Sequence, residues 1–200
     1  TGQQIRVLSG AEEAFWGYQG VKWSFPQLEK PIIMDLGGGS TEFSWTEGEN
    51  LACVSTKVGA VRMTEKNHTE AEILNLLKPA LERIKNWEQP FVAIGGTATT
   101  LAAIGLAQKE YLDRQGFRLT LEQIQDIQCQ IAGLSLEERK NLPGMSPDRV
   151  DIIPAGIRII TLVMQQLHKR ELLISNTGLM HGLVLGLDNY WVITNVLTYE

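Results

Sequence analysis

Three consecutive glycines between a carboxylate and two hydroxyl residues limit most strongly how this chain can fold. The stretch reads Asp35-Leu36-Gly37-Gly38-Gly39-Ser40-Thr41-Glu42 and follows the apolar run 32–34. Each glycine adds unfolded-state entropy that folding must overcome, so something is expected to approach this backbone closely. A phosphate oxygen suits the position, because several N–H groups of a glycine turn can point at one anion while hydroxyls and carboxylates handle a metal or water. The alternative is a strand that ends in a tight turn.

The residues on both sides of the glycines predict strands. Residues 31–34 form an apolar strand, and 41–45 and 51–56 read as an antiparallel hairpin around the polar turn 47–50. The glycine stretch is therefore predicted to be a hairpin turn itself. That excludes a P-loop, whose glycines precede a helix and a Lys-Ser/Thr pair. Residues 58–63 are predicted to extend the third strand, with Lys57 and Arg62 as solvated edge cations.

A second glycine pair follows another apolar strand, 91–94. Gly95-Gly96-Thr97 leads from that strand into a helical pattern that begins at 98. This order can place backbone N–H groups and a helix N-terminus at an anion, although a glycine pair also permits close packing of strand and helix. Together with the first glycine stretch, it favours a phosphate site.

Two adjacent carboxylates open the first predicted helix. Residues 5–8 read as a short strand, Ser9 is a candidate helix cap, and Glu12 and Glu13 lie in the first turn. Glu12 is interpreted as a complement to the helix dipole, and Glu13 could instead face a cleft. Periodicity alone leaves open which carboxylate points where.

The remaining chain alternates helices with one more strand. Residues 22–30 and 109–117 read as connections, and Asp148 and Asp151 suit the dipole of the helix that they precede. Thr120 is a candidate helix cap. We expect a helix from 69 to 87, two helices within 124–142, a long helix over 152–167, the last strand over 172–175 and the last helix over 178–186.

The composition narrows the class of protein. The chain has 200 residues, of which 44% are hydrophobic and 20% charged, and no apolar run approaches the length of a membrane span. A formal charge of −5 argues against generic nucleic-acid binding. Two cysteines are too few for a disulfide framework, so we expect reduced thiols and a cytoplasmic protein. The N-terminus lacks a starting Met, which suggests a cut or processed end.

Several of these motifs together resemble the exopolyphosphatase and guanosine pentaphosphate phosphohydrolase (Ppx/GppA) family, a branch of the actin and sugar-kinase superfold. The matching stretches are 9–14, 35–42, Gly59-Ala60-Val61-Arg62, 95–101 and Arg149-Val150-Asp151 with Ala155-Gly156. The resemblance implies an α/β fold: a ribonuclease H-like, actin-type ATPase lobe whose mixed sheet joins three antiparallel strands to parallel ones, with helices on both faces. It also implies that residues 1–200 form the second of two lobes, with the first lobe outside this chain.

The implied activity is that of an enzyme that hydrolyses terminal phosphoanhydride bonds in polyphosphate or guanosine pentaphosphate with a divalent cation, usually Mg²⁺. Glu13 aligns with the catalytic carboxylate that activates water, and Asp35 and Glu42 align with acids that position water and metal. The phosphate-binding residues would be Gly37, Gly38, Gly39, Ser40, Thr41, Gly95, Gly96 and Thr97. Phosphoryl transfer depends mainly on alignment and charge neutralisation, which such a set supplies.

The chain departs from the family pattern near its end and in its first helix. Phe15 stands where the family often has Arg, whereas Asn176-Thr177 and His181 replace an acid-glycine pair and a glutamate in what we expect to be a peripheral element. The alternative function is a regulatory module that binds phosphates or nucleotides without turnover, and a kinase-like member is a third. We expect weak or no activity from this lobe alone, no membrane or specific nucleic-acid partner, and a possible homodimer.

Overall fold

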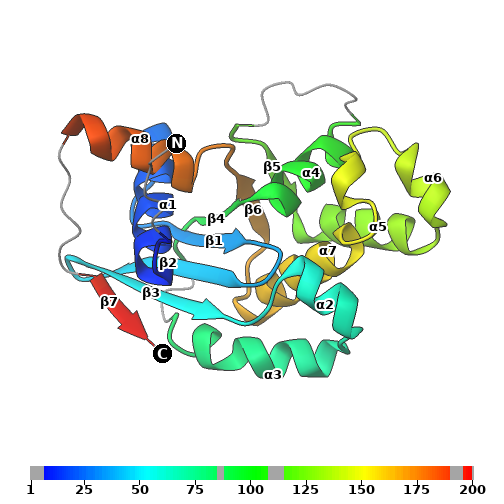
Figure 1. The fold of residues 1–200 in the computed structure, drawn as a ribbon, viewed down its shortest axis with the longest axis horizontal. Coiled ribbons are helices and arrows are strands. Elements are labelled where there is room, and N and C mark those ends of the chain that lie inside the picture. Colours follow the sequence, from blue (N-terminus) through cyan, green and yellow to red (C-terminus); the bar gives the residue numbers. More distant parts are fainter. Residues whose placement is uncertain (1–6, 85–87, 108–114, 190–195, 200) are drawn as a thin grey trace, which may run out of the picture.

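The computed structural model describes residues 7–84, 88–107, 115–189 and 196–199 (Figure 1). Capping signals in the sequence begin several helices: Ser9, Thr69, Thr120 and Ser135 each form a capping box with the residue three positions later. In chain order the elements are α1 (Gly10–Ser24), β1 (Ile32–Leu36), β2 (Thr41–Glu47), β3 (Asn50–Thr56), α2 (Ala60–Lys66), α3 (Glu70–Leu81), β4 (Phe91–Ile94), α4 (Gly96–Gly105), β5 (Arg118–Thr120), α5 (Leu121–Ala132), α6 (Leu136–Lys140), a 3₁₀ turn η1 (Pro147–Arg149), α7 (Ile153–Gln166), β6 (Glu171–Ile174), α8 (Leu179–Asn189) and β7 (Val196–Tyr199).

The described strands form one seven-stranded mixed sheet in the order β5-β6-β4-β1-β2-β3-β7. β1, β2 and β3 pair antiparallel, whereas β4 and β6 continue parallel to β1 on one side and β7 pairs parallel with β3 on the other. β5 closes the opposite edge antiparallel to β6. The carboxyl ends of β1, β4 and β6 therefore lie at one edge of the sheet, where ligands of open α/β sheets bind.

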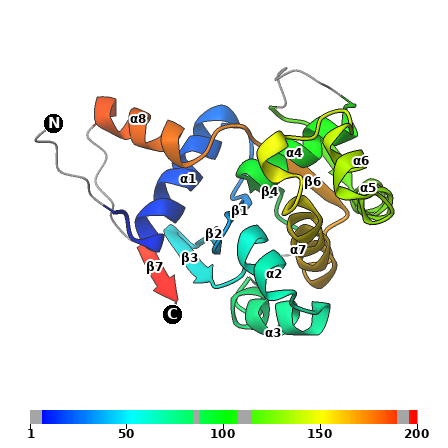
Figure 2. The same ribbon diagram turned by 45° about the vertical axis from the view of Figure 1, so that its right-hand side comes forward.

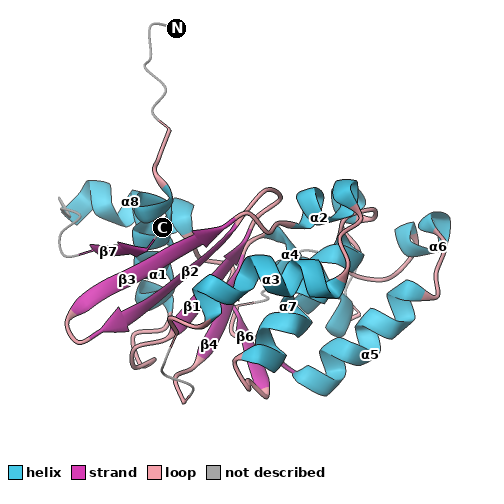
Figure 3. Cartoon of the chain, turned by 90° about the horizontal axis from the view of Figure 1, so that it is seen from below, coloured by secondary structure: helices cyan, strands magenta, loops and turns pink. Residues whose placement is uncertain are grey.

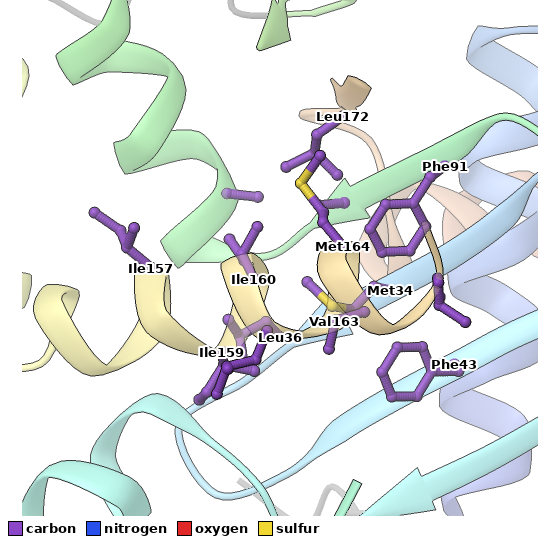
Figure 4. Close-up of a cluster of buried hydrophobic side chains, with 14 of the residues drawn as sticks. Met34, Leu36, Phe43, Phe91, Ile157, Ile159, Ile160, Val163, Met164 and Leu172 are labelled. Atoms are coloured by element: carbon purple, nitrogen blue, oxygen red, sulfur yellow. The ribbon is translucent and has the colours of Figure 1, made fainter. Parts of the chain in front are cut away.

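Helices cover both faces of the sheet, and each face has its own core (Figure 3). α7 packs over Met34, Leu36 and Phe43 from β1 and β2, and Figure 4 shows its Val163 beside Met34 and its Ile159 beside Leu36. On the other face α1 packs its Phe15 and Val21 over Ile33, Val92 and Leu173. Because successive strand residues point to opposite faces, Asp35 lies on the α1 face together with Ile33.

Glycines bring α1 and α8 into close contact on that face (Figure 2). A Cβ atom built on Gly182 would lie 1.9 Å from the carbonyl oxygen of Trp16, and one on Gly20 would lie 2.3 Å from the carbonyl oxygen of Gly178. Only residues without a side chain allow backbones to approach so closely. The packing fixes α8 against α1, and with it the connection from β6 to α8.

The predicted fold class is confirmed, as are the strands on both sides of the glycine stretch and the β1–β2 and β2–β3 hairpins, but several boundaries differ. Residues 58–63 do not extend the third strand, because α2 begins at Ala60. α1 reaches Ser24, so the predicted connection from 22 begins later, and β5 and β7 were not predicted. Of the predicted strand over 5–8, residues 5 and 6 lie outside the described residues, as does much of the 109–117 connection, and residues 7 and 8 are not in a strand. Among the described helices, none is long and apolar enough to cross a membrane.

Candidate active site

Three carboxylates meet on the α1 face of the sheet, at the carboxyl end of β1. Asp35 and Glu42 are directly opposite partners in the antiparallel pairing of β1 with β2, and such partners have Cβ atoms about 5 Å apart. Ser55 is the next partner along the row, on β3, and its hydroxyl donates to Glu42 Oε1 at 2.6 Å. The start of α1 lies over this row, since a Cβ on Gly10 would lie 3.5 Å from that of Ser55. The first turn of α1 thus brings Glu13 to the two strand carboxylates.

The helix cap decides which of the two adjacent glutamates faces the site. The carboxylate of Glu12 accepts hydrogen bonds from the backbone N–H of Ser9 at 2.8 Å and from its hydroxyl at 2.9 Å, which completes the capping box. Glu13 is coupled electrostatically to Asp35 and Glu42 instead. The interpretation of Glu12 as a helix residue agrees with the geometry, and Glu13 is the glutamate of α1 that lies near the two strand carboxylates.

Burial and neighbouring negative charge raise the pKa of two of these carboxylates, Asp35 and Glu13. Burial, followed by the negative charges of Glu42 and Glu13, raises the pKa of Asp35 from 3.8 to about 6. Burial and then the charge of Glu42 also raise the pKa of Glu13 above 4.5. Clustered acids of this kind repel each other unless a cation or a proton neutralises them, and perturbed carboxyl pKa values are typical of functional sites.

The first glycine stretch forms the turn between β1 and β2, and α2 holds it from outside. Gly37 donates its N–H to the carbonyl oxygen of Ser40 at 3.0 Å, while the Gly37 carbonyl oxygen accepts from the N–H of Ala60 at 3.0 Å. Gly59 makes this approach possible, because a Cβ there would lie 2.4 Å from the Gly38 oxygen. These long-range hydrogen bonds explain why residues 60–66 are a helix and not the predicted strand.

Three N–H groups of the turn are left over for a ligand. Those of Gly38, Gly39 and Ser40 form no hydrogen bond with the part of the chain that the structure describes. Thr41 is different, since its side chain is fully buried and its hydroxyl donates to the carbonyl oxygen of Val58 at 2.7 Å. The turn can thus offer backbone donors to a phosphate, while the Thr41 hydroxyl is used to support β2.

The second glycine pair lies directly beside Asp35. Gly95 is the N-cap of α4 with a φ of +94°, a conformation that favours glycine, and a Cβ there would lie 3.0 Å from Asp35 Oδ1. Gly96 follows as the first residue of α4, whose N-terminus carries partial positive charge. Thr97 is buried and packs against Gly156 of α7, where a Cβ would lie 2.5 Å from its methyl group. The pair of glycines reaches the site, and the Thr97 side chain lies in the core.

A cleft of about 290 Å³ opens at this position. Asp35, Gly95, Gly96 and Thr99 line one side. Ser175, Asn176 and Gly178 from the connection between β6 and α8, together with His181 of α8, line the other. The expectation that Asn176 and His181 belong to a peripheral element is therefore wrong. The parallel pairing of β6 with β4 brings the residues after β6 to the same edge of the sheet as Asp35, which the local sequence does not reveal.

Hydrogen bonds hold this connection in place. Gln115 accepts from the backbone N–H of Asn176 at 2.6 Å, and the hydroxyl of Thr177 donates to that of Ser24 in α1 at 2.7 Å. The Oδ1 atom of Asn176 is buried and has no hydrogen-bond partner among the described residues. A polar atom of that kind, in a cleft, fits an additional ligand contact or an ordered water.

An arginine that sequence reasoning gave no role also contacts the second glycine pair. A Cβ on Gly96 would lie 2.0 Å from Cζ of Arg149, so the guanidinium rests against the Gly96 backbone. Arg149 is in η1, between α6 and α7, and is half-buried. Its place in the motif Arg149-Val150-Asp151 was the only signal in the sequence. Phe15, the departure from the family pattern in the first helix, is buried and packs edge-to-face on Trp16 with ring centroids 4.9 Å apart.

The donor set suits a hard cation that arrives with substrate. Asp35 and Glu42 offer carboxylate oxygens, and Mg²⁺ is commonly held by one or two carboxylates, substrate phosphates and water. Within the described residues no group of three or more His, Cys, Asp and Glu side chains is arranged to hold a metal ion alone. Asp35 and Glu42 could supply carboxylate ligands to a cation whose other ligands are substrate phosphates and water.

Comparisons with known proteins agree with these features. Residues 1–190 match the model of the Ppx/GppA phosphatase family. The chain is 28% identical to Exopolyphosphatase 2 of Mycobacterium tuberculosis over 93% of its own length and 65% of that protein. It is 26% identical to the guanosine-5'-triphosphate,3'-diphosphate pyrophosphatase of Aeromonas salmonicida, over 92% of its length and 39% of that protein.

Solved structures are similar as well. A crystal structure of the Ppx/GppA family member of Aquifex aeolicus superimposes with a TM-score of 0.81 and 28% identity, over 94% of this chain and 66% of that one. The chain thus spans less than two thirds of the length of the curated relatives described above.

Proposed function

Because this chain belongs to the Ppx/GppA phosphatase family, we propose that it contributes the catalytic carboxylates and phosphate loops for hydrolysis of a terminal phosphoanhydride bond. Inorganic polyphosphate and guanosine pentaphosphate are the proposed substrates, by analogy with relatives named an exopolyphosphatase and a guanosine pentaphosphate pyrophosphatase. The observation that carries the proposal is the meeting of Glu13, Asp35 and Glu42 beside two glycine loops.

In the proposed reaction Glu13 acts as general base. Burial and the charge of Glu42 raise the pKa of Glu13, which makes it a stronger proton acceptor than an exposed glutamate. It takes a proton from water as the water oxygen bonds to the terminal phosphorus. The bond from that phosphorus to the bridging oxygen breaks, so orthophosphate and a shortened polyphosphate or nucleotide leave.

The other residues bind and orient the substrate. The free N–H groups of Gly38, Gly39 and Ser40 would hold phosphate oxygens on one side, and Gly95 and Gly96 at the N-terminus of α4 on the other. Asp35 and Glu42 would hold Mg²⁺, which when bound neutralises charge on the phosphates. Ser55 orients Glu42 through the hydrogen bond to Oε1.

The adjacent glutamates of α1 provide a matched test in the intact protein. Glu13→Gln should lower the rate of phosphate release by about a hundredfold or more, because the base is lost. Glu12→Gln removes the same charge one residue away, keeps a side chain able to cap the helix, and should leave the rate within about twofold of wild type.

Unchanged turnover in Glu13→Gln would overturn the assignment. Calorimetric titration with tripolyphosphate, guanosine pentaphosphate and ATP, with and without Mg²⁺, accompanies the assay. Saturable binding by wild type without phosphate release would favour a regulatory module over an enzyme.

A further inference from the structure

Arg62 contacts the first glycine turn twice, through its backbone and through its side chain. Its backbone N–H donates to the carbonyl oxygen of Gly38 at 3.0 Å, and its Nε donates to that of Gly39 at 2.7 Å. With the hydrogen bond from Ala60 to Gly37, three successive carbonyl groups of the turn are bound from the first turn of α2. The predicted role of Arg62 as a solvated edge cation does not agree with these contacts.

These carbonyl contacts fix where the N–H groups of the turn point. In a trans peptide the C=O and the N–H of the next residue are antiparallel. When the carbonyl groups of Gly37, Gly38 and Gly39 all face α2, the N–H groups of Gly38, Gly39 and Ser40 all face away from it. Those are the three N–H groups without a partner in the described chain. Convergent N–H groups of this kind form an anion-binding nest.

Glycine peptides need such an external restraint. They rotate more freely than others, and a flipped peptide would turn a donor away from the anion and present a carbonyl oxygen to it. Two of the three restraints come from the backbone of α2. The third, on the peptide between Gly39 and Ser40, comes from the Arg62 side chain alone.

We propose that Arg62 is a positioning residue, which holds the peptide between Gly39 and Ser40 so that the Ser40 N–H completes the phosphate nest. This inference rests on the proposed function of the turn. It makes the Nε–H donor the essential feature of Arg62 and gives the positive charge a minor role. The guanidinium forms no ion pair with a carboxylate of the described residues, and Nη2 lies 3.7 Å from the place where a Gly39 Cβ would be.

Three substitutions separate the donor from the charge. Arg62→Gln places an N–H donor at the same distance along the side chain as Nε and removes the charge. Arg62→Lys keeps the charge but has a methylene at that position, and Arg62→Met has neither. Lys66→Met is the matched control, since it removes a positive charge from an exposed side chain in the last turn of the same helix.

Phosphate release from tripolyphosphate by the intact protein gives KM and kcat, and calorimetry gives the dissociation constant for tripolyphosphate independently of turnover. In Arg62→Met and Arg62→Lys we expect KM and the dissociation constant to rise about tenfold and kcat/KM to fall about a hundredfold, as for loss of one aligned backbone donor. Arg62→Gln should recover wild-type values to within about threefold, and Lys66→Met to within about twofold. Thermal unfolding of each variant gives its folded fraction at the assay temperature, so that the constants are compared per folded molecule.

The inference is overturned if Arg62→Lys behaves as wild type while Arg62→Gln behaves as Arg62→Met, because charge would then explain the effect. Equal values for Arg62→Met and Lys66→Met would also overturn it. If wild type binds tripolyphosphate without releasing phosphate, the proposed hydrolysis fails while the dissociation constants still decide the role of Arg62. A merely structural role would lower the folded fraction and leave the KM of the folded protein unchanged.

Discussion

Replacing Asp35 with asparagine should stabilise the folded chain at alkaline pH. Folding raises the pKa of Asp35 from 3.8 to about 6, through burial and the charges of Glu42 and Glu13. The native state therefore holds this proton more tightly than the unfolded state does. Its contribution to stability is present below pH 4 and is lost as the pH rises through 6. With both states ionised, the charge destabilises the native state by about 3 kcal/mol.

Urea unfolding of this chain at several pH values measures the effect. At pH 8 the free energy of unfolding of Asp35→Asn should exceed that of wild type by about 2–3 kcal/mol. Near pH 4 the difference should shrink to a few tenths of a kcal/mol, because wild-type Asp35 is then protonated and an amide resembles a neutral carboxyl group. In the intact protein the same variant should no longer release phosphate, because substitutions that relieve a destabilised active site often cost activity.

An exposed acid supplies the control. Asp126→Asn, on the exposed side of α5, should change the free energy of unfolding by less than about 0.5 kcal/mol at either pH. The electrostatic reasoning is refuted if Asp35→Asn is no more stable than wild type at pH 8, or if its advantage is as large at pH 4 as at pH 8.

Three other substitutions test the scaffold by urea unfolding. Gly182→Ala should destabilise the chain by about 2 kcal/mol or more, because its methyl group would lie 1.9 Å from the Trp16 carbonyl oxygen; a neutral result would contradict the close α1–α8 packing. Thr41→Val keeps the shape but removes the donor to Val58, at a loss of about 1–3 kcal/mol; a gain in stability would argue against that buried hydrogen bond. Ser9→Ala removes the N-cap of α1 and should lower the free energy of unfolding by about 1 kcal/mol; an unchanged value would mean that Ser9 does not cap the helix.

Local patterns in the sequence were enough for the elements whose causes are local. The alternation of 41–45 and 51–56 predicted the β2–β3 hairpin, and hydroxyl residues ahead of helical patterns predicted the caps at Ser9 and Thr120. The position of Asp35 after an apolar strand and before three glycines marked it as a candidate site residue, and the structure places it beside both glycine stretches. Hairpin pairing then places Glu42 opposite Asp35 with no further information, because a tight turn fixes the register.

Long-range contacts decided the rest. Residues 58–63 have a strand-like composition, yet Ala60 and Arg62 donate to the carbonyl groups of Gly37 and Gly38, and those bonds favour a helix there. Asn176 reaches the cleft because β6 pairs parallel to β4, so the residues after β6 emerge at the same edge of the sheet as Asp35. The sequence alone thus determined that a glycine turn would lie beside Asp35. Only the tertiary structure determined which way its peptides face, because glycine has no side chain to fix them and the partners that do so are more than twenty positions away.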